Sequence, residues 1–343
     1  MPLPRIRAEP EDFVVEEIPV YEPAGSGPHT WCWVEKRLRT TDDVVTRLAA
    51  VAGVAPREVG FAGRKDRRAV TRQWISVPGL DPGRAERLAD PGMRVLRAVS
   101  HRHRLHLGDL LGNRFRLRVR DLDAVGLHAA REAWDELRAR GLPNRFGRQR
   151  FGRDGGNAER GRRALAGETL EAPPRRVRLY LSALQAEGFN EILHRRPVPR
   201  DQALPGDLLV EHATGALRPV RDPGEWTAAL ASFDVSPTAP LFGPKARRAT
   251  GLAGRLEREA LAAVGVPDPL PGDVLRRFRI SGERRAIRVP VGEGSFEPGD
   301  GLLDLSFVLP PGSYASVLLD EVLAAGCEEV LDGGAGDEGG DHV

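Results

Sequence analysis

Residues 113–120, NRFRLRVR, alternate strictly between polar and apolar side chains. Successive side chains of a β-strand point to opposite faces, so the pattern predicts a strand that buries Phe115, Leu117 and Val119. The other face of this strand carries four arginines: Arg114, Arg116, Arg118 and Arg120. The chain must therefore contain a sheet with one buried face and one face coated with arginine.

Strands and helices are mixed throughout the first part of the chain. Short segments rich in β-branched and aromatic residues predict strands at 11–18, 30–36, 58–61 and 71–77. An amphipathic helix is expected from Thr41 to Gly53, capped at its start, and another over 124–140, closed by Gly141. Together these elements predict a mixed α/β fold.

The pattern changes near residue 168, where prolines become frequent. The 343 residues are enough for two domains, and we expect a separate unit to begin at this point. Later elements are expected as helices at 175–196, 251–264 and 313–325, the last capped by Ser313, and as strands at 275–280, 284–289 and 302–309.

The charge is unevenly distributed. The formal net charge is only +2, but the last 24 residues hold eight acidic side chains and no Lys or Arg, which leaves the rest at +10. Arginines and histidines concentrate at 94–120, and arginines at 144–163. Such clusters are expected of a nucleic-acid-binding protein, although arginine-rich surfaces that are merely solvated are equally common.

Several classes of protein are not expected. No stretch has the roughly 20 apolar residues of a membrane helix, and the first residues lack the apolar core of a signal peptide. We therefore expect a cytoplasmic protein that does not bind membranes. Cys32 and Cys327 are too few and too far apart for a disulfide framework or a zinc site.

One loop places a carboxylate among cations. Residues 62–69, AGRKDRRA, hold Asp66 between Lys65 and two arginines, in a turn between short strands. Cationic neighbours keep a carboxylate ionised and available as a nucleophile or base. The alternative is a solvated, charged hairpin tip.

A second loop, 144–152, has the sequence NRFGRQRFG. Arginines can contact phosphate while an aromatic ring stacks on an unstacked base, so Arg148 and Arg150 are candidate RNA contacts, as are Arg114 and Arg116 of the alternating strand. We interpret Phe151 as a core anchor and Phe146 as a ring that faces a partner. Asn144 either hydrogen-bonds a pyrimidine edge or fixes the turn.

These two loops resemble motifs of the TruD family of tRNA pseudouridine synthases. GFAGRKDRRAVTRQW resembles the family's catalytic motif, and NRFGRQRFG a second motif. Four further segments match in the same order: EDFVVEE (11–17), HRLHLGDLLGNRF (103–115), YLSALQAEGFNEIL (180–193) and SFVLPPGSYAS (306–316).

The resemblance implies roles for individual residues. Asp66 would be the catalytic aspartate, while Phe13, Asn144 and Phe307 would line the uridine site. Phe146 falls where other pseudouridine synthase families place a tyrosine against the base, and Lys65 would either keep Asp66 ionised or contact RNA. Isomerisation of uridine needs one carboxylate, with no metal and no cofactor.

The resemblance also implies the architecture. It is a pseudouridine synthase-type catalytic domain with a mixed, largely antiparallel sheet, interrupted by a family-specific α/β insertion domain. We place the catalytic domain at 1–167 and 284–331, the insertion at 168–283, and a disordered acidic tail at 332–343.

The implied function is isomerisation of uridine 13 of tRNA, with tRNA as the partner and no obligate protein partner evident. Two alternatives stay open. A non-catalytic RNA-binding protein would leave Asp66 unexplained, and a carboxylate-dependent nucleosidase or glycosidase-like hydrolase normally needs a second carboxylate.

Overall fold

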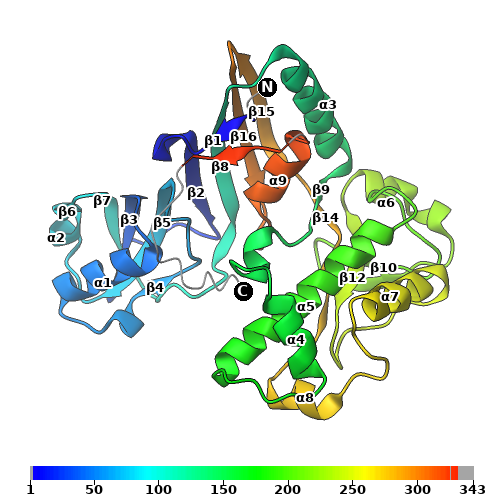
Figure 1. The fold of residues 1–343 in the computed structure, drawn as a ribbon. Coiled ribbons are helices and arrows are strands. Elements are labelled where there is room, and N and C mark those ends of the chain that lie inside the picture. The colour runs from blue at the N-terminus through cyan, green and yellow to red at the C-terminus, as the bar shows by residue number, and fades with distance from the viewer. Residues whose placement is uncertain (1–2, 325, 331–343) are drawn as a thin grey trace. The chain divides into compact units, whose positions relative to one another are not determined.

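The computed structural model describes residues 3–324 and 326–330 (Figure 1). The chain divides into two units, which we describe separately. The first comprises Met1–Asp135, Val291–Ala315 and Leu319–Val343, and the second comprises Glu136–Pro290 and Ser316–Leu318. The predicted insertion, 168–283, lies within the second unit, which also includes flanking residues on both sides. The predicted tail at 332–343 lies outside the described residues.

The first unit is built on a mixed sheet. Its main path runs in the order β15-β16-β8-β2-β5-β3-β7-β6, with β1, β4 and β17 paired to its sides. The pairs β2–β5 and β1–β17 are parallel and the others antiparallel, which confirms the predicted fold class. The strands are β1 (Arg5–Ile6), β2 (Phe13–Pro19), β3 (His29–Arg37), β4 (Gly60–Phe61), β5 (Val70–Pro78), β6 (Ala89–Asp90), β7 (Met93–His101), β8 (Leu110–Arg120), β15 (Gly292–Gly299), β16 (Leu302–Leu309) and β17 (Glu328–Glu329).

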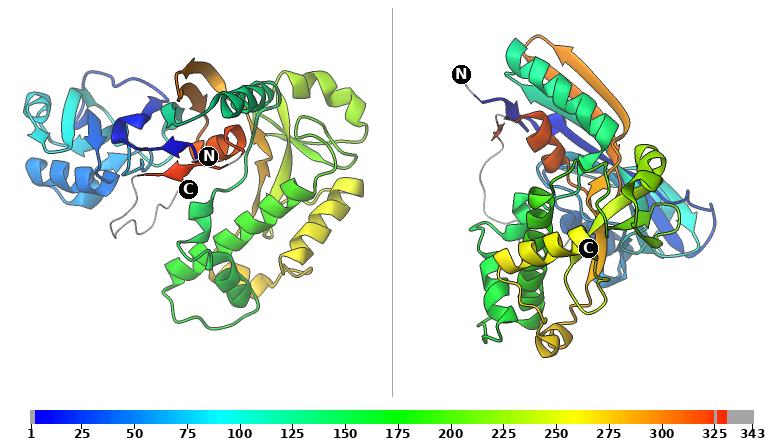
Figure 2. Two further views of the ribbon diagram at one scale, coloured as in Figure 1. Left: turned by 45° about the horizontal axis from the view of Figure 1, so that its top comes forward. Right: turned by 90° about the vertical axis from the view of Figure 1, so that its right-hand side faces the viewer.

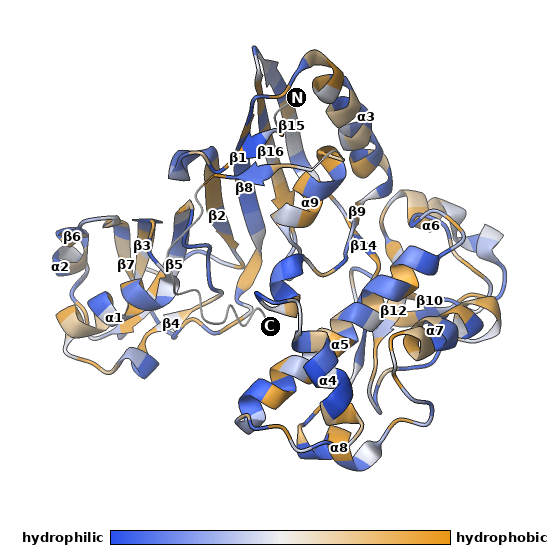
Figure 3. Ribbon diagram, in the orientation of Figure 1, coloured by the Kyte–Doolittle hydropathy of each residue, from blue (hydrophilic) through white to orange (hydrophobic). Residues whose placement is uncertain are grey.

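Alternation along the strands gives this sheet two different faces, and Figure 3 shows hydrophilic and hydrophobic residues interleaved along it. Val15 of β2 lies opposite Phe115 of β8 and Thr71 of β5, so these three side chains share one face. Helix α1 (Thr41–Ala52) packs on this face through Val44 and Leu48. We call it the covered face.

Two further helices belong to this part of the chain, α2 (Pro82–Glu86) and α3 (Ala124–Arg140). Figure 2 shows α3 alongside β15 and β16. Trp134 of α3 contacts Phe296 and Phe307, with ring centroids 6.3 and 6.2 Å apart, so α3 extends the cover of the same face.

The second unit has a four-stranded sheet in the order β11-β10-β12-β13 and a two-stranded pair, β14–β9. Helices α4 and α5 pack closely, because a Cβ at Gly161 would lie 2.3 Å from the Tyr180 carbonyl oxygen. The elements are β9 (Leu142–Pro143), α4 (Asn157–Leu165), α5 (Pro174–Arg195), β10 (Leu208–Glu211), β11 (Leu217–Pro219), α6 (Thr227–Ala231), β12 (Val235–Leu241), α7 (Gly251–Ala263), α8 (Gly272–Arg277), β13 (Glu283–Ala286) and β14 (Arg288–Val289).

The strand predicted at 275–280 is wrong. The structure has helix α8 there, which follows Pro271 and buries Leu275 against the α4 and α5 residues Leu165 and Leu181. One buried leucine among arginines suits a short helix as well as a strand, so the pattern could not distinguish them. The C-terminal helix, α9, spans Ala315–Val322 and follows Tyr314, not Ser313.

No helix within the described ranges is long and apolar enough to cross a membrane.

Candidate active site

Asp66 lies in the connection between β4 and β5, in the first unit. Its side chain is 41% exposed, and one carboxylate oxygen, Oδ2, is 3.2 Å from Nη2 of Arg7. Among the described residues, no hydrogen bond reaches the other oxygen, Oδ1. The carboxylate is therefore held by a cation on one side and available on the other.

Buried polar groups fix the backbone around Asp66. The ammonium of Lys36, a buried residue of β3, donates to the carbonyl oxygens of Asp66 at 2.7 Å and Lys65 at 3.2 Å. Thr41, at the start of α1, accepts from the Lys65 amide at 3.0 Å, and Gln73 donates to the Gly63 carbonyl at 2.9 Å. The loop is therefore held on the covered face by residues of β3, β5 and α1.

Lys65 does not pair with the neighbouring Asp66. Its ammonium lies 2.8 Å from the Glu17 carboxylate, and both side chains are almost fully buried, at 4% and 1% exposed. Glu17 also accepts from the Trp74 backbone amide at 3.2 Å. The cation that pairs with Asp66 is Arg7. Arg7 is therefore placed to keep Asp66 ionised, a role that we had expected of Lys65.

Arg7 links Asp66 to Phe13. Its guanidinium lies 3.9 Å from the centre of the Phe13 ring, and its backbone has a φ of 54°, which is uncommon for a residue with a Cβ. Phe13 and Phe307 both lie on the covered face and are buried, and each contacts Phe115. Phe13 and Phe307, both predicted to line the uridine site, thus belong to one aromatic cluster on the covered face of the sheet.

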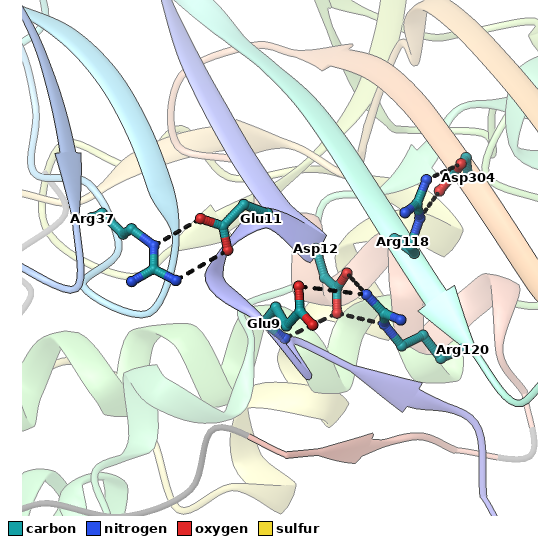
Figure 4. Close-up of polar contacts among 7 residues, drawn as sticks. All are labelled: Glu9, Glu11, Asp12, Arg37, Arg118, Arg120 and Asp304. Atoms are coloured by element: carbon teal, nitrogen blue, oxygen red, sulfur yellow. Dashed lines mark hydrogen bonds and ion pairs between the residues drawn. The ribbon is translucent and has the colours of Figure 1, made fainter. Parts of the chain in front are cut away.

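Alternation along β8 places its arginines on the face opposite to Phe115, and Figure 4 shows two of them, Arg118 and Arg120, with their carboxylate partners. Three of the four, Arg114, Arg118 and Arg120, are paired with carboxylates of adjacent strands, of the segment before β2 or of β15. Arg118 binds Asp304 through two contacts of 2.8 Å, and Arg120 binds Asp12 at 2.9 and 2.7 Å. Burial raises the pKa of Asp12, but the Arg120 hydrogen bonds, the Glu9 backbone amide and the positive charges of Arg120 and Arg118 together hold that pKa below its usual value.

The predicted RNA contacts Arg114 and Arg116 belong to this opposite face. Arg114 is 2.6 Å from Glu293 and 3.7 Å from Glu16, so it is already paired. Arg116 is exposed. Neither arginine lies on the face that carries Asp66, so the placement does not favour contact with RNA near Asp66.

The loop at 144–152 belongs to the second unit. The Asn144 amide donates to the Ala286 carbonyl at 2.9 Å and accepts from Arg285, which favours the turn-fixing interpretation of Asn144. Phe146 packs edge-on against Phe189, with centroids 5.6 Å apart, and the Arg285 guanidinium lies 4.5 Å from its ring centre.

Burial of the two phenylalanines is the reverse of our prediction. Phe146 is buried, whereas Phe151 is half-buried at the end of a short 3₁₀ turn over Arg148–Phe151. Arg148 is exposed, and Arg150 hydrogen-bonds Ser182 of α5. Helix α5 supplies Phe189 as a packing surface for Phe146, a partner that the loop sequence alone does not reveal.

Asn190 of α5 fixes the backbone of Phe146. Its side-chain amide accepts from the Phe146 N–H at 2.8 Å and donates to the Phe146 carbonyl at 3.0 Å. We expect Asn190→Ala to destabilise the second unit by about 1–3 kcal/mol, because it leaves two peptide groups unpaired. Denaturant unfolding measures the loss. Asn190→Asp, which keeps only the acceptor, should fall between Asn190→Ala and wild type, and equal stability of all three proteins would contradict this role.

Sequence reasoning missed four residues of these networks: Arg7, Lys36, Glu17 and Asn190. A signal existed for Lys36, since the chain has only three lysines and Arg is its usual cation. Glu17 continues the alternation of Phe13 and Val15 onto the covered face, where a carboxylate needs a cation. Nothing near Arg7 or Asn190 indicates its partner.

Within the described residues, no three His, Cys, Asp or Glu side chains are grouped as metal ligands. Burial raises the pKa of the Cys32 thiol to about 12, which makes this cysteine a poor nucleophile.

Comparisons with known proteins agree with one another. The family model described as "tRNA pseudouridine synthase D (TruD)" matches residues 4–172 and 159–322. The chain is 37% identical to tRNA pseudouridine synthase D of Geobacter metallireducens, over 94% of this chain and 95% of that protein. It is 41% identical to the Thermus thermophilus protein of the same name, over 93% and 88%. A crystal structure from Methanosarcina mazei, described as tRNA pseudouridine synthase D, matches with a TM-score of 0.78 and 25% identity over 93% of both chains.

Proposed function

The chain belongs to the TruD family of tRNA pseudouridine synthases, and from this premise we propose that it converts uridine 13 of tRNA to pseudouridine with Asp66 as the catalytic carboxylate. The observation that carries the proposal is the Asp66 carboxylate itself. It is partly exposed, paired with Arg7 on one oxygen, and mounted on a loop whose backbone is fixed by Lys36 and Thr41.

Such a carboxylate suits the chemistry. Isomerisation breaks the bond between N1 of uracil and C1′ of ribose, turns the base and joins C5 to C1′; C5 then loses its proton and N1 gains one. Asp66 can attack C1′, remove the C2′ proton to give a glycal, or add to C6 of the base. Each route begins with an ionised carboxylate in a fixed position, and fixing the loop in advance lowers the cost of reaching that geometry.

We propose that the other predicted residues either support the site or contact the substrate. Phe13 lies against Arg7, so it supports the cation beside Asp66. Lys65 and Phe307 are buried in the first unit, which favours support of the site from beneath. In the second unit, Asn144 and Phe146 are buried as well, while Arg148 and Arg150 remain candidate phosphate contacts.

Because the family model and the relatives are named for the modification of tRNA, we propose a cytoplasmic enzyme that acts on tRNA. The test is to incubate the purified protein with an unmodified tRNA transcript and to map pseudouridine at each position. We expect one pseudouridine, at position 13, and none in a transcript with cytidine there. Release of free uracil would indicate a hydrolase, and tight binding without any modification would indicate a non-catalytic RNA-binding protein.

A further inference from the structure

One basic surface of the first unit is not explained by the contacts described so far. The segment between β7 and β8 begins with the residues RHRLHL at 102–107. Leu105 is buried, while the other five side chains of this segment are exposed, and Leu107 is 58% exposed although it is apolar. We call Arg102, His103, Arg104, His106 and Leu107 the 102–107 surface.

The arginines of this surface differ from three of the four arginines on the exposed face of β8. Among the described residues, Arg102 and Arg104 have no carboxylate within ion-pair distance, whereas Arg114, Arg118 and Arg120 all do. The nearest acidic partner in the segment is Asp109, 3.7 Å from the His106 ring. The 102–107 surface therefore carries positive charge that the protein does not neutralise.

The backbone of the segment is fixed. The Trp31 indole donates to the His103 carbonyl, and Ser76 accepts from the Leu105 amide, both at 2.9 Å. The segment crosses Gly60 so closely that a Cβ there would lie 2.3 Å from the Leu105 carbonyl oxygen. The exposed side chains thus project from a rigid support, which reduces the entropy lost when they bind a partner.

An exposed aromatic ring adjoins the surface. Tyr21 is 42% exposed, and its ring stacks on His101 with centroids 5.6 Å apart and an angle of 26°. His101 in turn lies against Trp31, at 4.3 Å. A ring supported on one side and open on the other can stack with an unpaired base.

The segment is also tied to the loop of Asp66. The Gly108 amide donates to the Ala62 carbonyl at 2.9 Å. Ala62 precedes Asp66 by four residues, so their Cα atoms are at most about 14 Å apart. This hydrogen bond brings one end of the segment near the Asp66 loop, while Trp31 and Ser76, which hold the rest of its backbone, lie on the face of the sheet opposite to Lys36 and Gln73.

We infer that the 102–107 surface binds the phosphates of the tRNA strand that flanks the target uridine, with Tyr21 available to stack on an unpaired base. The inference rests on the proposed function for the identity of the RNA. It assigns phosphate binding by the first unit to this segment and not to the carboxylate-paired arginines of β8, Arg114, Arg118 and Arg120.

The test compares two double variants of equal charge. Arg102→Gln with Arg104→Gln removes two arginines that have no carboxylate partner among the described residues, of which Arg104 donates to the Val59 carbonyl at 2.9 Å. Arg94→Gln with Arg118→Gln removes two exposed arginines that are paired with Glu35 and Asp304. For the first variant we expect KM for tRNA to rise roughly tenfold with little change in kcat. The salt dependence of log Kd should weaken by roughly 0.9 for each phosphate that the variant no longer neutralises.

The control variant should stay within about twofold of wild type in KM and keep its salt slope, because its arginines already have carboxylate partners. The single variant Arg102→Lys should retain binding, since it keeps the charge. Unchanged KM and salt slope in the Arg102/Arg104 variant would overturn the inference. If wild type binds tRNA but makes no pseudouridine, the proposed function fails, and the salt slopes still decide whether this surface binds RNA.

Discussion

Asp66→Asn is expected to lower pseudouridine formation by at least about 10³-fold, because base catalysis alone contributes roughly 10²–10⁴ and the change also removes the nucleophile. Folding should be nearly unaffected. Asp66 is 41% exposed, and its ion pair with Arg7 is of the kind that contributes at most about 1 kcal/mol. Affinity for tRNA should persist or tighten, since a negative charge is lost beside a polyanion.

The measurement is tritium release from tRNA labelled at C5 of uridine, with tRNA affinity and Tm taken on the same preparation. Asp42→Asn is the matched control. Asp42 is also exposed and pairs at 3.3 Å with Arg64, a residue of the same loop as Asp66, so this control removes one negative charge from the same neighbourhood. It should keep wild-type turnover. Turnover of Asp66→Asn within about tenfold of wild type would eliminate Asp66 as the catalytic residue.

Local patterns in the sequence were sufficient for most individual elements. The helix predicted at 124–140 has those bounds, and the strand predicted at 113–120 is the second part of β8. Both rest on long, regular periodicities, which local sequence encodes strongly. The segment at 275–280 has no such periodicity, and packing against α4 and α5 decided its conformation.

Partners were not predictable in the same way. Alternation along β8 placed four arginines on one face, but only the sheet order reveals that Asp304 of β16 lies opposite Arg118. Likewise Asp66 was identified from its loop, while Arg7, 59 residues away, comes beside it through tertiary structure. A one-dimensional pattern specifies the face on which a side chain lies, and strand register specifies what it meets.

Lys65 also has a partner, Glu17, that the local sequence does not reveal, and we expect its substitution to have the largest effect on stability. We expect Lys65→Met to destabilise the first unit by about 3–5 kcal/mol, because it leaves the Glu17 carboxylate buried without a cation. The Trp74 amide would still donate to that carboxylate, but it carries no charge. In a chain of this size the loss should lower Tm by roughly 5–15 °C, which thermal and denaturant unfolding would measure.

Two further variants separate this structural role from a role at Asp66. Glu17→Gln combined with Lys65→Met should recover much of the lost stability, because no unpaired charge stays buried. Arg7→Met should do the opposite of Lys65→Met, with a small change in Tm and a large loss of turnover, since Arg7 is the cation beside Asp66. If the Lys65→Met protein melts within about 2 °C of wild type but has an altered pH–rate profile, the stabilising role of the Lys65–Glu17 pair is wrong. Lys65 would then act on the ionisation of Asp66.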